Sequence, residues 1–308
     1  MDKVAELKSK EIYEILFPSI GFFLPLLEEK RAEITSTPKK TFKYGEAERH
    51  KLDIYYPSEA PSTGKTPIIF FIYGGGFAAG DRSQPPPADL GYGNLANYFS
   101  RKGFITIIPD YRLMPDVSFP GPMEDVKSAV KWILENDHAL RNGNINDPDT
   151  DGIFLMGHSA GGVNVATILL YPGLVEREIL SKIKGAVIIS AVYNFDPQTA
   201  PTTAPDVLDK FWGGYEEFQK KSPYALLKNA SEEAVGKLPK ILMVESENDP
   251  DSFITVGTQW QELLDEKTKE KHEKVIAKGH NHISITWALS TGQGEEWAEK
   301  VTEWLKGI

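Results

Sequence analysis

A serine flanked by glycines is the residue of this chain best placed to do chemistry. Gly157-His158-Ser159-Ala160-Gly161 follows an apolar, strand-like run and precedes a segment compatible with a helix. A serine on a sharp strand-to-helix turn adopts strained backbone angles, so its neighbours must lack bulky side chains. The turn would expose the Ser159 hydroxyl at the start of the helix, where unpaired N–H groups favour negative charge. The pattern predicts a nucleophile elbow.

A serine hydroxyl needs a base that removes its proton during attack, and histidine usually serves. The chain has six histidines. We expect His158, inside the motif, to point away from the serine proton. Three others lie in charged segments that we expect to be solvated: His50, His138 and His272. His280 and His282 remain, in a loop after the last predicted strand, where sheets of parallel strands place their sites. We favour His282 as the base, with His280 as the alternative.

A carboxylate must then hold the histidine in the correct tautomer and stabilise its charged form. Four acidic residues follow the strand-like run 241–244: Glu245, Glu247, Asp249 and Asp251. Asp249 is our candidate because it lies a few residues beyond the strand and Pro250 fixes the backbone just after it. The chain order Ser159, Asp249, His282 differs from the orders in chymotrypsin-like and subtilisin-like proteases.

A glycine-rich loop upstream could stabilise a negatively charged oxygen. Tyr73-Gly74-Gly75-Gly76-Phe77 directly follows a predicted buried strand. Glycines let a loop turn its N–H groups toward a substrate oxygen without interference from side chains. A phosphate-binding loop is the alternative, but neither of the usual glycine-rich phosphate motifs is completed here. We expect the N–H groups of Gly75, Gly76 and Ala160 to form an oxyanion hole.

Alternating strands and helices would position these residues. The predicted strands are 52–56, 68–73, 104–108, 153–156, 186–189, 241–244 and 274–277, and the predicted helices are 123–135, 162–170, 255–267 and 295–306. Alternation of this kind requires a mostly parallel sheet covered by helices on both faces. We therefore expect one α/β domain over residues 1–308, with about eight strands.

Two segments fall outside this alternation and are expected to form a small helical cap over the site. They are residues 1–34 and 191–238. For residues 1–34, a packing role without substrate contact remains the alternative. Four aromatic residues are candidate pocket walls that would suit a short or aromatic acyl group, and each could equally belong to the core: Phe77, Tyr193, Phe195 and Trp212.

Composition excludes several kinds of function. The chain has 308 residues, of which 41% are hydrophobic and 25% charged, and its net charge is −10. This charge argues against nucleic-acid and anionic-membrane partners. The absence of cysteine removes disulfides and thiolate metal sites. The apolar run 15–27 contains two prolines and is too short to span a bilayer, and no positive region precedes it as in a secretory signal. We expect a cytoplasmic protein without stable membrane insertion.

With these residues in place, the chain resembles the α/β-hydrolase superfamily, specifically hormone-sensitive-lipase-like carboxylesterases and small hydrolases such as kynurenine formamidases. The resemblance runs from about residue 50 and rests on these motifs: Asp110-Tyr111-Arg112-Leu113-Met114-Pro115, Phe119-Pro120, Glu124-Asp125 leading to Trp132, Gly157 to Gly162, and Asp249-Pro250. The family pattern supports Gly75 and Gly76 as oxyanion donors. One departure is Tyr73, where the lipase-like group usually has histidine; the cholinesterase-like branch has Tyr-Gly-Gly-Gly-Phe.

The resemblance and the residues together imply a serine hydrolase of the carboxylesterase type. It would cleave a small-molecule ester of a small or medium acyl group through an acyl-enzyme on Ser159, with no metal or organic cofactor. An amidase or N-formyl hydrolase would use the same three residues. A binding protein on a hydrolase scaffold and a lyase that forms no acyl-enzyme are further alternatives. The natural substrate and the oligomeric state stay open at this point.

Overall fold

An eight-stranded sheet forms the centre of the molecule. The computed structural model describes residues 1–59, 64–145, 147–195 and 207–308. The strand order is β1-β2-β4-β3-β5-β6-β7-β8; β2 runs antiparallel to both its neighbours, and from β4 to β8 the strands are parallel. The strands are β1 Lys39–Lys43, β2 Lys51–Tyr55, β3 Thr66–Ile72, β4 Ile105–Pro109, β5 Pro148–His158, β6 Ile183–Ile189, β7 Lys240–Asn248 and β8 Lys274–Asn281. The predicted mostly parallel α/β sheet is confirmed.

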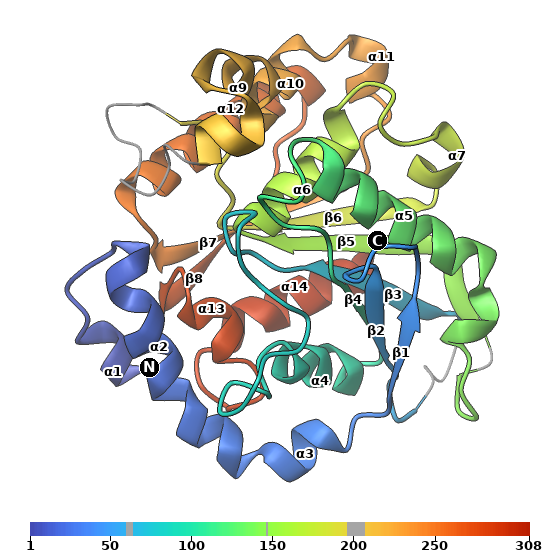
Figure 1. Cartoon of the computed structure of the whole chain (residues 1–308), viewed down its shortest axis with the longest axis vertical. Helices are drawn as coiled ribbons and strands as arrows, with labels where there is room; N and C mark the ends of the chain where they lie inside the picture. Colours follow the sequence, from blue (N-terminus) through green and yellow to red (C-terminus); the bar gives the residue numbers. More distant parts are fainter. Residues whose placement is uncertain (60–63, 146, 196–206) are drawn as a thin grey trace.

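Helices cover both faces of this sheet. Helices α4, α13 and α14 lie on one side, and α5, α6 and α10 lie on the other (Figure 1). The α-helices are α1 Asp2–Ala5, α2 Ile12–Glu29, α3 Arg31–Thr35, α4 Gly93–Arg101, α5 Gly121–Glu135, α6 Ala160–Leu170, α7 Arg177–Leu180, α9 Tyr215–Lys221, α10 Pro223–Asn229, α11 Glu232–Val235, α12 Asp251–Thr268, α13 Ser284–Trp287 and α14 Glu296–Gly307. The described residues also form two short turns: the 3-10 turn η1 Asp137–Leu140 and the π-helical turn η2 Leu208–Trp212.

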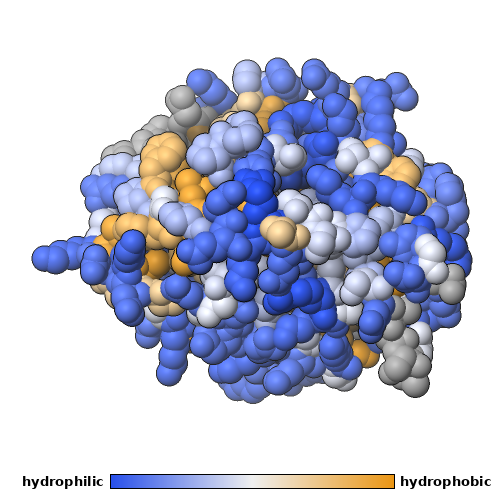
Figure 2. Space-filling view, turned by 90° about the horizontal axis from the view of Figure 1, so that it is seen from below, coloured by the Kyte–Doolittle hydropathy of each residue, from blue (hydrophilic) through white to orange (hydrophobic). Residues whose placement is uncertain are grey.

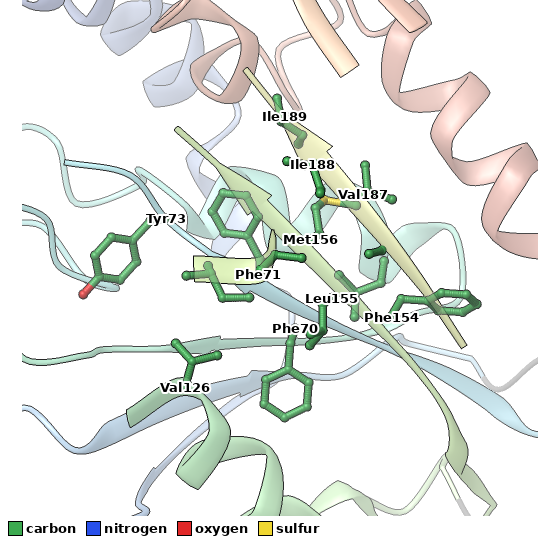
Figure 3. Close-up of a cluster of buried hydrophobic side chains, with 14 of the residues drawn as sticks. Phe70, Phe71, Tyr73, Val126, Phe154, Leu155, Met156, Val187, Ile188 and Ile189 are labelled. Atoms are coloured by element: carbon green, nitrogen blue, oxygen red, sulfur yellow. The ribbon is translucent and has the colours of Figure 1, made fainter. Parts of the chain in front are cut away.

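The central strands are apolar throughout because both of their faces are covered. Residues 68–72 of β3 and 153–156 of β5 are buried, and so are residues 185–189 of β6. Figure 3 shows Phe70, Met156 and Val187 among the side chains that fill this core. The core fixes the register of β3, β5 and β6, since a slip by one residue would exchange the side chains on the two faces.

Several elements were not predicted from the sequence: the short helices α7 and α13, the turn η1, and the larger elements β1 and α4. Strand β1 (KKTFK) lies at the sheet edge and is mostly exposed, so it lacks the apolar pattern of a buried strand. Helix α4 is almost entirely buried, but it buries polar residues as well as apolar ones. Asn94, for example, donates hydrogen bonds to the carbonyls of Thr286 and Leu289 (both 2.9 Å). These buried amides interrupt the apolar periodicity by which a helix is recognised.

The N-terminal segment forms a long helix against the C-terminal part of the domain. Helix α2 includes both prolines of the apolar run, and its buried side packs beside α13 (Figure 1). No helix in the described ranges is both long and apolar enough to cross a membrane. Of the second predicted cap segment, residues 196–206 lie outside the described residues, and the remainder forms η2 and helices α9 to α11.

Candidate active site

The candidate residues all follow the ends of strands at one edge of the sheet. Ser159, Asp249 and His282 come directly after the last residues of β5, β7 and β8. The glycine loop follows the end of β3 in the same way. Because these strands are parallel, their carboxyl ends meet at one edge, which is where open α/β sheets bind ligands. The topology thus gathers residues separated by more than two hundred positions in the sequence.

The turn at Ser159 has the strained geometry expected of a nucleophile elbow. Ser159 has φ 55° and ψ −123°, and helix α6 begins at the next residue. A Cβ at Gly157 would collide with the Gly161 carbonyl, and one at Gly161 would collide with the Ile72 carbonyl at the end of β3. The glycines therefore let the elbow press against its neighbours. They also leave the half-buried Ser159 at the N-terminus of α6.

Asp249 and His282 form a buried pair beside this elbow. Asp249 Oδ1 lies 2.8 Å from His282 Nδ1, and both side chains are almost completely buried. This contact fixes the ring orientation and engages Nδ1 rather than Nε2. The His282 ring centroid lies 4.8 Å from that of His158, the residue before the serine. Within the described residues Ser159 Oγ has no hydrogen-bond partner, as is common for catalytic groups without substrate.

Ser190, which the sequence reasoning missed, holds the other oxygen of Asp249. Ser190 directly follows β6, has φ 47°, and donates a 2.5 Å hydrogen bond from Oγ to Asp249 Oδ2. The backbone N–H of Ser246 donates to the same oxygen at 2.9 Å. These two donors hold Oδ2 in place while Oδ1 faces His282. A serine at the end of a buried strand carries no distinctive sequence signal, so only the packing of β6 against β7 exposes its role as a partner of Asp249.

The hydrogen bonds of His280 and His282 distinguish these two candidates for the base. His280 is buried, with Nδ1 3.1 Å from Ser284 Oγ and Nε2 2.6 Å from the Gly294 carbonyl oxygen. Both ring nitrogens thus face partners away from Ser159, and burial lowers the pKa of His280 below its usual value. His282 instead contacts Asp249. The geometry therefore favours His282 over His280 as the base.

The environments of His158 and the three remaining histidines agree only in part with the sequence predictions. His158 is buried against His282, and burial together with that neighbouring ring holds its pKa well below the usual value. The expectation that His50 and His272 are solvated is wrong. His50 Nε2 lies 3.1 Å from Asp125, His272 Nδ1 lies 3.0 Å from Asp265, and both side chains are mostly buried. His138 is exposed, as predicted.

The glycine loop lies directly against the elbow. A Cβ at Gly74 would come within 2.8 Å of Ser159 Cβ, so only glycine allows this approach. Gly75 and Gly76 have φ 123° and 61°. Their N–H groups, and that of Ala160, have no hydrogen-bond partner among the described residues. Three free donors beside a nucleophile can stabilise an oxyanion.

A buried polar network holds the glycine loop in place. Tyr111 Oη donates to the Tyr73 carbonyl at 2.8 Å, and Tyr73 Oη donates to Asp110 Oδ1 at 2.8 Å. Arg82 forms an ion pair with Asp110. Burial raises the pKa of Asp110, while the hydrogen bonds from Arg82 and Tyr73 oppose that rise. Tyr73 therefore anchors the loop through its hydroxyl.

The candidate wall residues lie in two separate places. Phe77 stacks on Phe211 with ring centroids 4.1 Å apart, and Trp212 stands perpendicular to Phe77. Phe195 packs against Phe218 (5.2 Å between ring centroids), which in turn contacts Trp212 (5.1 Å). Tyr193 instead stacks on Trp260 of α12 (4.4 Å) and is buried. It lines a small cavity of about 10 Å³ that also borders Asp249 and Ser190. Tyr193 therefore lies next to Asp249 and Ser190, apart from the ring cluster around Phe77.

No group of three or more potential metal ligands occurs among the described residues.

A protein-family model described as BD-FAE matches residues 52–207, which contain the glycine loop and the elbow. The chain belongs to this family. It is similar to kynurenine formamidase from Danio rerio, with 28% identity over 156 residues that cover 50% of this chain and 46% of that protein. It is also similar to the probable isoprenylcysteine alpha-carbonyl methylesterase ICMEL1 from Oryza sativa subsp. japonica, with 27% identity over 219 residues that cover 67% of this chain and 48% of that protein.

This BD-FAE family member thus matches about half the length of these curated relatives. Among solved structures, esterase B from Lactobacillus rhamnosis is similar over 96% of this chain and 95% of that chain, with a TM-score of 0.68 and 17% identity. At this level of identity the likeness concerns the fold. The α/β-hydrolase fold expected from the sequence is confirmed by this match and by the strand order.

Proposed function

We propose that this protein is a serine hydrolase that cleaves carboxylic esters through an acyl-enzyme on Ser159. The observation that carries the proposal is the buried Asp249–His282 pair, 2.8 Å apart, beside a serine held at φ 55°. A strained serine, an oriented imidazole and free N–H donors are the parts that acyl transfer needs. The names of the relatives, a methylesterase and a formamidase, support a hydrolytic reaction.

Each group has one role in the proposed reaction. Ser159 Oγ attacks the acyl carbon while His282 Nε2 takes its proton, and the negative charge on the carbonyl oxygen is bound by N–H groups of Gly75, Gly76 and Ala160. His282 then gives the proton to the leaving alcohol as the C–O bond breaks. Water, deprotonated by His282, attacks the acyl-serine and releases the acid. Asp249 keeps the imidazole oriented and stabilises its charged form.

We propose that the acyl group is small or medium in size. Phe77 follows the last glycine of the loop, and its ring is covered by Phe211 and Trp212. Packed rings beside the oxyanion donors favour a short acyl chain, because a long chain would have to displace them. Rates on p-nitrophenyl esters from acetyl to palmitoyl measure this: we expect the short esters to be cleaved fastest, and a preference for the palmitoyl ester would contradict the proposal.

A labelling experiment tests the enzyme class. A serine-directed fluorophosphonate should add to Ser159 in the wild-type protein and leave Ser159→Ala unlabelled, as read by peptide mass spectrometry. p-Nitrophenyl acetate should be hydrolysed by the wild type, with kcat reduced by several orders of magnitude in Ser159→Ala. A folded wild-type protein that neither reacts with the probe nor hydrolyses the ester would refute the enzyme proposal and favour a binding protein.

Hydrolysis of an N-formyl amide is the second candidate, and the similarity to a kynurenine formamidase favours it. An ester and an amide share the same acyl-enzyme, so the site geometry supports both. Rates on a matched pair, phenyl formate and formanilide, discriminate between them. A higher kcat/KM on the ester, after correction for the uncatalysed rates, supports the esterase, and the reverse supports the formamidase. Turnover without a trappable acyl-serine would instead indicate a lyase.

A further inference from the structure

An arginine outside the proposed catalytic set contacts both ends of the loop that carries the three glycines. Arg49 lies in the turn between β1 and β2, at the edge of the sheet. Its Nη2 donates a 2.9 Å hydrogen bond to Tyr73 Oη and a 2.8 Å hydrogen bond to the Gly80 carbonyl. Tyr73 precedes the three glycines, and Gly80 follows the turn after them. One guanidinium group thus joins the two ends of segment 73–80.

Segment 73–80 folds back on itself, so that its two ends touch. A Cβ at Gly80, which has φ 110°, would lie 2.6 Å from the Tyr73 ring and 2.8 Å from the Gly74 carbonyl oxygen. A Cβ at Gly75 would collide with the Ala79 carbonyl. Because the returning residues lie this close to the glycines, a displacement of Gly80 would displace the glycines as well.

The direction of one proposed oxyanion donor depends on the same returning residues. The Gly75 carbonyl accepts hydrogen bonds from the N–H groups of Ala78 (3.1 Å) and Ala79 (3.0 Å). The N–H and C=O of a trans peptide point in opposite directions, so the N–H of Gly76 points out of this turn. Ala79 is bonded to Gly80, and the hydrogen bond from Arg49 to Gly80 therefore helps to fix that direction.

Arg49 reaches the start of the loop by a second route. Its Nε donates to the Tyr111 carbonyl at 2.8 Å, and the Tyr111 hydroxyl donates to the Tyr73 carbonyl at 2.8 Å. The side chain of Arg49 is 28% exposed, and its charge is balanced by Asp81 at 3.5 Å and Asp110 at 3.7 Å. The arginine is thus held in place by charge as well as by directed hydrogen bonds.

We infer that Arg49 is a positioning residue of the proposed oxyanion hole. By bonding Tyr73 and Gly80, it keeps the N–H groups of the glycine loop aimed at the substrate oxygen. This inference rests on the proposed function, because the oxyanion forms only when Ser159 attacks an acyl carbon. Loss of Arg49 should therefore weaken binding of the tetrahedral oxyanion much more than binding of the uncharged substrate.

Kinetics of Arg49→Ala, corrected for the folded fraction from thermal unfolding, test this inference. On p-nitrophenyl acetate we expect kcat to fall about thirtyfold, less than the roughly 10²–10³-fold cost of removing an oxyanion donor outright. Acylation and deacylation both pass through an oxyanion, so both should slow and KM should change less than about threefold. A trifluoromethyl ketone, which bonds reversibly to Ser159 Oγ and leaves a negative oxygen, should bind more weakly by about the same factor as kcat/KM falls.

Two further measurements keep the test independent of one variant. Arg49→Lys retains the charge but not the planar group that bonds several acceptors at once, so it should also lose kcat. Guanidinium chloride at a concentration that does not denature the protein should restore part of the activity of Arg49→Ala, because the site is partly exposed. Sodium chloride at the same concentration should restore none.

Arg101→Ala is the matched control. Arg101 is the last residue of α4 and forms an ion pair with Glu33 of α3. It comes just before β4, at the amino end of that strand, whereas the candidate site lies at the carboxyl ends. Helices α3 and α4 lie at the bottom of Figure 1, and the face seen from below is largely hydrophilic (Figure 2). We expect Arg101→Ala to keep the wild-type kcat and inhibitor affinity.

The outcomes separate this inference from the proposed function. A folded wild-type protein that hydrolyses no ester would overturn both. An active wild type together with a folded Arg49→Ala whose kcat stays within about threefold of it would overturn the inference alone. A fall in kcat without weaker binding of the trifluoromethyl ketone would also overturn the inference, since the loss would then arise away from the oxyanion.

Discussion

At the scale of single residues, Ser190 determines how the carboxylate of the proposed triad is held. Its hydroxyl donates to Asp249 Oδ2 at 2.5 Å, while Oδ1 faces His282. We expect Ser190→Ala to lower kcat on p-nitrophenyl acetate roughly ten- to hundredfold, because a buried hydrogen bond to a charged group is lost. KM should change little, since the Ser190 side chain is buried against Asp249.

Ser246 provides the matched control for this prediction. It donates to the same carboxylate oxygen through its backbone N–H, which Ser246→Ala retains. Among the described residues, the one hydrogen-bond partner of its side-chain oxygen is Ser190 Oγ, at 3.3 Å. We therefore expect Ser246→Ala to keep most of the activity. Equal losses in both variants would show that general disturbance of the buried cluster, and not the hydrogen bond from Ser190, affects the rate.

At the scale of elements, the elbow depends on close approach between α6 and β3. In Gly161→Ala the new Cβ would collide with the Ile72 carbonyl and lie 2.6 Å from the Tyr73 carbonyl. These are backbone atoms that cannot move aside, so we expect the free energy of unfolding to fall by about 3 kcal/mol. Thermal and urea unfolding measure the effect.

A glycine without such contacts should behave in the opposite way. At Gly21, in α2, an added Cβ would meet nothing within 4 Å. Gly21→Ala should therefore stabilise the protein by roughly 0.5–1 kcal/mol, because alanine has the higher helix propensity. A large destabilisation by Gly21→Ala, or none by Gly161→Ala, would contradict the packing described here.

The strands that were predicted from the sequence are those whose own residues are mainly apolar. The seven predicted strands match β2 to β8: the apolar runs of the central strands are covered on both faces, whereas β8 alternates buried and exposed residues. Strand β1 was not predicted because it lies at the sheet edge and is rich in exposed lysines. Helix α4 was not predicted because it buries the polar residues Asn94 and Asn97. Their hydrogen bonds are made with distant segments, which local periodicity cannot report.

In the candidate site, too, local motifs could be recognised from the sequence, whereas contacts between distant segments could not. Ser159 and the glycine loop carry local motifs, so the sequence could nominate them. His282 and His280 are two residues apart, and only their partners, Asp249 for one and Gly294 for the other, distinguish them. Ser190 has no motif at all. The choice between the two histidines and the role of Ser190 therefore depend on tertiary contacts, which the sequence alone does not show.

At the scale of the whole molecule, buried histidines link stability to pH. Burial holds the pKa of His280 below its usual value of about 6.5, so the folded state stays neutral where the unfolded chain binds a proton. Stability should therefore fall as pH drops from about 7 toward the lowered pKa, by up to about 1.4 kcal/mol per pH unit for one proton. Urea unfolding of the wild type and His280→Gln between pH 7 and 5 should show a shallower fall in the variant.

Buried carboxyl groups act in the opposite direction and make a control necessary. Burial raises the pKa of Glu245, so the folded state keeps a proton that the unfolded chain has lost, and this group favours folding as pH falls. The comparison of variant and wild type cancels this contribution. His138→Gln, at an exposed position, should leave the slope unchanged. A His280→Gln slope equal to that of the wild type would contradict the proposed linkage.

The central claim, that Asp249 and His282 serve Ser159 in acyl transfer, is tested most directly by comparing two histidine variants. We would measure kcat on p-nitrophenyl acetate for His282→Ala and His280→Ala, each corrected for its folded fraction. We predict a loss of roughly 10³-fold or more for His282→Ala and less than about tenfold for His280→Ala, whose ring bonds to Ser284 and Gly294. Equal losses, or a larger loss for His280→Ala, would contradict the proposed catalytic set.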